Sequence, residues 1–262
     1  MYLSLTIATL LIYLLGAFSF SVDLFSSGDR FAKLGVRIIA LGALLNAVTA
    51  VVGIASLGLG AMVALPNGLG LVSLSLVLGF LVTLRFQQVE PIGVLVAPLA
   101  LVNLIAVVVL GPHVEVSPSL RGGILPVHIT MSLVGTAAFG LAFFAAVLYL
   151  VQSYQLKQKR FGPLFRALPS LHELDRLNFR AISIGFPIYT AAILLGAIWF
   201  SRDPGNGENH FTTYALAVLS WLLYGIVLQA RLTAGWRGTK AAVMTVVGFV
   251  AAASVLVAYM VR

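Results

Sequence analysis

The sequence predicts an all-α integral membrane protein, a bundle of eight transmembrane helices with both chain termini outside. The first observation is composition: 60% of the 262 residues are hydrophobic, only 9% are charged, and the mean hydropathy is +1.06. Soluble domains carry about 25% charged residues, so this chain has too few charges to cover a water-facing surface. Two further observations, the apolar segments and the placement of the basic residues, predict the number of helices.

Apolar segments of roughly 20 residues, the length that crosses a bilayer, follow one another along the chain. We expect spans at about residues 3–25, 36–59, 69–86, 92–110, 124–151, 179–200, 211–229 and 240–260. The first has no basic n-region and no small-residue cleavage site after it, so we expect it to be retained rather than removed as a signal peptide. Residues 1–262 then form a single polytopic membrane domain.

The 16 Lys and Arg residues divide unequally between the two ends of such a bundle. Thirteen lie in or beside the loops that follow spans one, three, five and seven, and the other three are Arg121, Arg202 and Arg262. The positive-inside rule places the richer end inside, so we expect both termini outside in a multi-pass protein of the bacterial plasma (inner) membrane. The net charge of +8 is therefore a topology signal, the bilayer is the expected partner, and we expect no nucleic-acid partner.

The longest polar segment, Gln152 to Asn178, connects the fifth and sixth spans. Ser170 and Glu173 within it have the spacing of a helix-capping box, and a stripe of leucines follows. We therefore expect a helix that begins at the membrane surface and continues into the sixth span.

Histidines are the strongest candidates for chemistry, because the chain has no cysteine for disulfides, thiolate metal sites or thioether bonds. His172 lies in the basic segment, where we expect it to be solvated, and His113 lies in a loop rich in Pro and Gly. His128 lies about one turn inside the fifth span, where a polar group needs a partner. Two readings stay open for His128: a helix–helix hydrogen bond, for example to Ser132 or Thr130, or a metal ligand, with haem iron favoured because imidazole is a standard axial ligand.

Aromatic residues surround the fourth histidine, His210, at the outer mouth of the seventh span. Trp199 ends the sixth span and Phe211 begins the seventh. Aromatic residues at a membrane boundary usually form an interfacial belt, although a cluster beside two histidines would also suit a flat porphyrin. Trp221 and Tyr224 lie deeper, and we expect them to pack between helices.

No pattern typical of an enzyme active site occurs: there is no hydrolytic constellation, no phosphate-binding glycine loop and no HExxH motif. Asp23 is the acid closest to hydrocarbon, and the chain lacks the paired carboxylates of a proton-coupled transporter. We therefore expect a protein that is not an enzyme, and a small-molecule transporter is a disfavoured alternative.

Two stretches of the second half carry a family resemblance: LPSLHELDRLNFRAISIGFPIYTAAILLGAIWF at residues 168–200 and SWLLYGIVLQARLTAGWRGTKAAVMTVVGF at residues 220–249. Together with HITMS at residues 128–132, which is similar to an H-x-x-x-S motif at a helix start, they resemble the cytochrome c assembly family of CcsA/CcmC-type membrane proteins. The resemblance covers about residues 120–249. The family's motif W-G-x-[FY]-W-x-W-D-P is degenerate here, where residues 199–214 read WFSRDPGNGENHFTTY, and this favours the eight-helix HemX/YpjD-like branch.

The resemblance implies a haem-binding or haem-handling membrane protein related to cytochrome c biogenesis factors, with haem bound non-covalently. In that case His128 would be an axial ligand of the haem iron and His210 a second one, although His210 stands where the family has a tryptophan. Trp199 and Phe211 would lie against the porphyrin, and Arg121 or Arg202 would pair with the propionates. Other cytochrome c assembly proteins are the implied partners. The alternative is a HemX-type non-catalytic regulator, whose basic segment Lys157 to Arg176 would dock an enzyme of tetrapyrrole (haem) synthesis.

Overall fold

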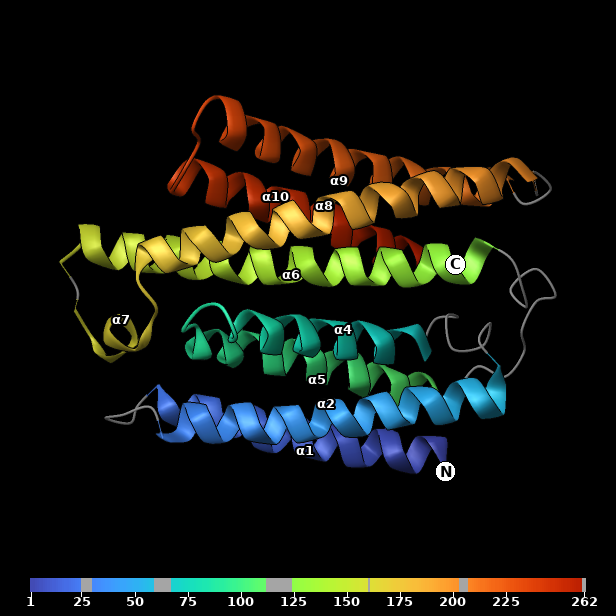
Figure 1. Cartoon of the computed structure of the whole chain (residues 1–262), viewed down its shortest axis with the longest axis horizontal. Helices are drawn as coiled ribbons and strands as arrows, with labels where there is room; N and C mark the ends of the chain where they lie inside the picture. The colour runs from blue at the N-terminus through green and yellow to red at the C-terminus, as the bar shows by residue number, and fades with distance from the viewer. Residues whose placement is uncertain (25–29, 59–66, 112–123, 160, 203–206, 261–262) are drawn as a thin grey trace.

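The computed structural model describes residues 1–24, 30–58, 67–111, 124–159, 161–202 and 207–260, without the side chains at 163–164, 200, 202, 207–211 and 256–260. The regular secondary structure of these residues is all helical, and they contain no strand (Figure 1). The long helices are α1 (Tyr2–Asp23), α2 (Arg30–Leu57), α4 (Asn67–Thr83), α5 (Gly93–Leu110), α6 (Ile124–Lys157), α8 (Leu171–Arg202), α9 (Gly207–Thr233) and α10 (Thr239–Met260). Two short helices, η1 (Glu90–Ile92) and α7 (Pro163–Ala167), lie in connections.

The predicted all-α membrane bundle is confirmed. Within the described ranges, six helices are long and apolar enough to cross a membrane, and two shorter apolar helices, Asn67–Thr83 and Thr239–Val255, complete the expected eight. The long helices run alternately in opposite directions, and both termini lie at one end of the bundle (Figure 1). The basic connections therefore meet at the other end, as the charge pattern predicts; which end faces outside stays a prediction.

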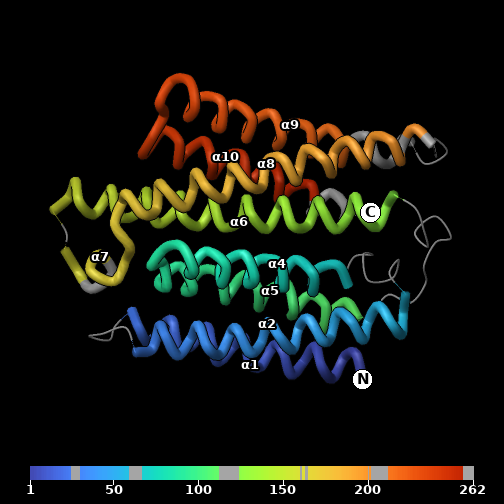
Figure 2. The backbone as a smooth tube through the Cα atoms, viewed as in Figure 1, coloured from blue at the N-terminus to red at the C-terminus, as the bar shows by residue number. Residues whose placement is uncertain are grey.

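The long helices form two groups that follow the order of the chain. Helices α1, α2, α4 and α5 contact one another, as do α6, α8, α9 and α10, and α4 against α6 makes the main contact between the groups (Figure 2). The most extensive contact in the bundle joins α6 to α8. Helix α6 is thus the central element, and its partner α8 carries much of the sequence that resembles the cytochrome c assembly family.

Small residues bring α6 and α8 close together, as is usual in membranes, where packing drives helix association. A Cβ atom on Gly185 would lie only 2.9 Å from the Cβ of Ala138. In the same core, the rings of Phe139 and Tyr224 stack with centroids 3.7 Å apart. Trp221 stacks on a ring of α8 and donates its Nε1–H to Thr190 Oγ1 at 2.8 Å. The prediction that Trp221 and Tyr224 pack between helices is confirmed.

Several helices extend further than the predicted spans. Helix α2 begins at Arg30 rather than at residue 36, α6 continues to Lys157 rather than 151, and α9 begins at Gly207 rather than 211. Hydropathy marks the part of a helix that crosses hydrocarbon, whereas the backbone hydrogen bonds continue into the polar turns beyond it.

The predicted start of α8 is confirmed. The backbone N–H of Glu173 donates to Ser170 Oγ at 3.2 Å, which is the capping contact that the spacing predicts. Helix α8 then continues without a break from Leu171 to Arg202. His172 is exposed in its first turn, as expected for a solvated residue.

Candidate functional site

His128 lies in the second turn of α6 and reaches across to α8. Its Nδ1 lies 2.6 Å from the main-chain carbonyl oxygen of Ala192. A carbonyl oxygen only accepts, so Nδ1 carries the proton and donates. The reading of a helix–helix hydrogen bond is confirmed as geometry, but the suggested partners were wrong: Ser132 Oγ donates to the His128 carbonyl oxygen, and Thr130 Oγ1 donates to the carbonyl oxygen of Pro126.

The hydrogen bond to Ala192 decides what the other ring nitrogen of His128 offers. A neutral imidazole carries one N–H, so protonation of Nδ1 leaves a lone pair on Nε2. Among the described residues, Nε2 has no hydrogen-bond partner. The side chain is half-buried. This is the arrangement found in metal-ligating histidines, in which one nitrogen binds the metal and the other donates to a carbonyl oxygen or a carboxylate.

A glycine of α8 accommodates the imidazole. A Cβ atom on Gly196 would lie 2.7 Å from Cε1 of His128, 3.0 Å from Nδ1 and 3.4 Å from Nε2. Neither Gly196 nor the Ala192 carbonyl was recognised from the sequence. The available signal was the Ala-x-x-x-Gly spacing on α8, which brings a bare turn of helix opposite a polar residue of α6.

Of the other predicted site residues, the structure describes only one side chain. Trp199 is half-buried in α8, one turn beyond Gly196 toward the end where both termini lie. Four fall outside what is described: Arg121 as a whole, and the side chains of Arg202, His210 and Phe211. The structure therefore brings His128 to the α8 turn before Trp199, while the second ligand and the propionate partners stay predictions. Within the described side chains, no three His, Asp or Glu residues gather to hold a metal ion.

The family-like stretches D-R-L-N and R-L-x-x-G-W-R-G meet in a second polar cluster, at the basic end. Arg231 Nη2 of α9 donates to Asp175 Oδ1 at 3.1 Å and to Asn178 Oδ1 at 2.6 Å. Gly238 N–H donates to the same Asp175 oxygen at 3.1 Å, and Asn178 Nδ2 donates to the carbonyl oxygen of Ala142 in α6 at 2.8 Å. The cluster ties α6, α8 and α9 to the start of α10, so these motif residues hold the C-terminal group together.

Glycines shape the turn between α9 and α10. Gly235 and Gly238 of the GWRG stretch have φ angles of +64° and +70°, in the region that glycine adopts freely and other residues avoid. The turn that they allow presents the Gly238 N–H to Asp175. Backbone geometry therefore explains the two glycines of the GWRG stretch. The turn lies at the basic end of the bundle, away from His128.

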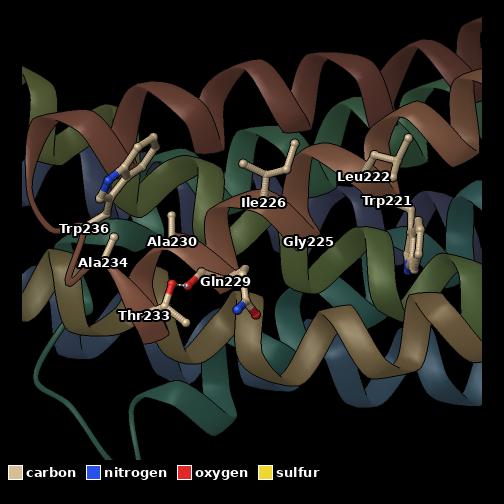
Figure 3. A pocket seen from close by; sticks show the side chains of 9 residues that line it. All are labelled: Trp221, Leu222, Gly225, Ile226, Gln229, Ala230, Thr233, Ala234 and Trp236. Atoms are coloured by element: carbon tan, nitrogen blue, oxygen red, sulfur yellow. Dashed lines mark hydrogen bonds between the residues drawn. The ribbon is translucent and has the colours of Figure 1, made fainter.

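An open groove of about 460 Å³ runs along the outer face of α9. Trp221 and Trp236 lie at its two ends, and the side chains between them come from α9 and the turn after it (Figure 3). Leu222 and Ile226 beside it are about half exposed, at 47% and 50%. In a membrane such a face meets lipid acyl chains, and it lies on a different helix surface from His128.

Comparison with known proteins agrees with the family resemblance seen in the sequence. The sequence model of a family described as cytochrome C assembly protein matches residues 8–262. The chain is similar to proteins called cytochrome c biogenesis protein CcsA: 33% identity over 132 residues to that of Chlamydomonas reinhardtii, covering 50% of this chain and 36% of the relative. It is 27% identical over 191 residues to that of Mesostigma viride, covering 63% of each. It is 29% identical over 154 residues to that of Synechococcus sp. (strain CC9605), and the aligned region covers 51% of each protein.

The match extends over nearly the whole chain, further than the expected residues 120–249. The chain spans less than two thirds of the length of these three relatives. None of the three carries a HemX-type name, so the HemX-like branch and the regulator that it implies stay predictions.

Proposed function

Since the chain belongs to the cytochrome c assembly protein family, we propose that it handles haem in the membrane during the assembly of c-type cytochromes. The observation that carries the proposal is the state of His128. Its Nδ1–H is bound by Ala192 of the neighbouring helix, so that the lone pair of Nε2 is left for a metal. Imidazole nitrogen is a standard protein ligand of haem iron.

The residues at this end of the α6–α8 pair fit a haem. Bound haem would supply an iron atom that takes a nitrogen ligand, and Nε2 of His128 would provide that nitrogen. The apolar helix surfaces would keep water from the ring, and Trp199, one turn beyond Gly196, would lie against the porphyrin. His210 as the second ligand, Phe211 as a further aromatic contact, and Arg121 or Arg202 for the propionates complete the proposed site. Binding is non-covalent on the side of this chain, which has no cysteine.

We infer that the chain binds and hands on haem and is not itself an enzyme. The tryptophan-rich motif of haem-presenting relatives is replaced by WFSRDPGNGENHFTTY at residues 199–214, which leaves one tryptophan for a haem platform. The bacterial plasma membrane, with the His128 end outside, is the proposed location, because basic residues concentrate at the opposite end. Other cytochrome c assembly proteins are the proposed partners.

The test is the absorption spectrum of the protein purified in mild detergent from haem-producing cells. We expect a Soret band for the wild type, its loss or a marked shift in His128→Ala, and no change in His172→Ala. His172 is the matched control, because it is an exposed histidine at the basic end of α8. A wild-type protein without haem, also after incubation with haemin, would refute the proposal. So would a His128→Ala spectrum identical to that of the wild type.

A further inference from the structure

We propose that Gly196 and the main-chain carbonyl of Ala192 are a positioning pair, which sets both the tautomer and the orientation of His128. The pair holds the proton on Nδ1 and so leaves the lone pair on Nε2. Its purpose, the presentation of Nε2 to haem iron, rests on the function proposed above. The arrangement itself is a property of the haem-free chain and is tested separately.

The carbonyl of Ala192 has room for a second hydrogen bond. In an α-helix the N–H of residue 196 donates to the carbonyl oxygen of residue 192. That oxygen has two lone pairs, so the second one accepts the Nδ1–H of His128, at 2.6 Å. The imidazole is thus hydrogen-bonded to the backbone of α8. A side-chain substitution elsewhere in α8 leaves this main-chain acceptor in place.

Gly196 is the residue that makes this carbonyl accessible. Residues four apart lie one above the other on a helix face, so a side chain at 196 would project beside the Ala192 carbonyl. Its Cβ would lie 2.7 Å from Cε1 and 3.0 Å from Nδ1 of His128, too close for the ring to stay where it is. It would also lie 3.4 Å from Nε2, in van der Waals contact with that nitrogen.

Within the described residues, helix α6 supplies no hydrogen bond to the His128 ring. The nearest hydroxyls of α6, those of Ser132 and Thr130, donate to main-chain carbonyl oxygens of their own helix. In the described part of the chain, the single hydrogen bond of the His128 ring goes to α8. Because the partner of one ring nitrogen decides which nitrogen carries the proton, α8 sets the tautomer.

The experiment uses the full-length, haem-free protein labelled with ¹⁵N-histidine, in detergent micelles. The ¹⁵N shifts of the two ring nitrogens report which one is protonated, and His128→Ala identifies the signals. For the wild type we expect Nδ1–H alone. For Gly196→Ala we expect the Nε2–H form or a mixture of both forms, because the ring is displaced from the carbonyl.

Gly185→Ala is the matched control. It adds the same methyl group to the same α6–α8 contact, where the new Cβ would lie 2.9 Å from Ala138 Cβ, but it does not touch His128. We expect it to lower stability and to leave the Nδ1–H form unchanged. A wild-type protein with Nε2–H, or a Gly196→Ala protein with the wild-type tautomer, would overturn the proposal.

If Gly196→Ala does not fold, the double variant His128→Ala/Gly196→Ala shows whether Gly196 makes room for the His128 ring or for the packing of the helix backbones. Removal of the ring removes the overlap, so we expect the double variant to fold like His128→Ala. Failure of the double variant would make Gly196 a site of backbone packing and overturn its positioning role. The haem spectrum is read independently: a wild-type protein that carries Nδ1–H but takes up no haem, even after incubation with haemin, contradicts the function proposed above and leaves the positioning pair standing.

Discussion

Replacement of Arg231 by leucine will test the polar cluster that holds the C-terminal helices together. The Arg231 side chain is only 4% exposed, and its Nη2 is shared by Asp175 and Asn178. The guanidinium also lies over the ring of Phe179, 5.7 Å from its centroid. Loss of the arginine leaves the Asp175 carboxylate, at 22% exposure, with the Gly238 N–H as its described donor.

The size of the expected loss of stability in Arg231→Leu follows from the burial of Arg231 and Asp175. Breaking a buried ion pair by removing one partner costs about 3–5 kcal/mol. The partial exposure of Asp175 lets water replace some of the lost interaction, so the lower end, about 3 kcal/mol, is the expected loss. For a chain of this length, 1 kcal/mol corresponds to about 2–4 °C in Tm. The expected fall is therefore about 6–12 °C.

The assay is the amount of monodisperse protein left by size-exclusion chromatography after heating in detergent. Arg237→Leu is the matched control, since this arginine belongs to the same GWRG turn but is exposed; its expected effect is within about 0.5 kcal/mol. Equal melting of the two variants would refute the reasoning. A second refutation would be strict additivity of Arg231→Leu and Asp175→Leu in a double-mutant cycle, because contacting residues couple by about 0.5–3 kcal/mol.

Other substitutions give sharp contrasts in the same melting assay. Tyr224→Ala removes a fully buried ring stacked on α6 and will cost about 3–5 kcal/mol, whereas Tyr214→Ala, at 42% exposure, will change little; equal effects would contradict the packing. Gly93→Ala will destabilise because its Cβ would overlap a phenylalanine ring of α1, while Gly70→Ala, with open space around it, will be neutral or stabilising by up to about 1 kcal/mol. Ser170→Ala will cost about 1 kcal/mol through the lost α8 cap, and no loss would mean that the cap is not formed in the membrane.

The membrane fold was predictable because hydrophobicity and charge are read directly from the chain. A helix must satisfy its own backbone in lipid, so each long apolar segment becomes a span, and the basic residues assign the connections to the two ends. Local patterns were equally informative: Ser170 and Glu173 form the cap that their spacing predicts. Helix ends were less accurate, as at Arg30 and Lys157, because polar turns continue a helix beyond the hydrocarbon.

The contacts of the candidate site were not predictable in the same way. His128 required a partner, but any backbone carbonyl on a neighbouring helix satisfies that requirement, and the one it uses is 64 residues away. Asp175 and Arg231 lie in stretches that resemble family motifs, yet nothing in their spacing shows that they pair across 56 residues. Such contacts follow from how helices pack, which depends on the shapes of many side chains together.

The most direct test of the central claim, that Nε2 of His128 ligates haem iron, is chemical rescue of His128→Gly. Glycine removes the imidazole and leaves a space of its size between α6 and α8, which free imidazole can enter. We predict that the purified variant has lost the Soret band of the wild type, and that imidazole added with haemin restores it, whereas 1-methylimidazole, which cannot donate to the Ala192 carbonyl, restores it less. A His128→Gly protein that keeps the wild-type haem spectrum without imidazole would contradict the account.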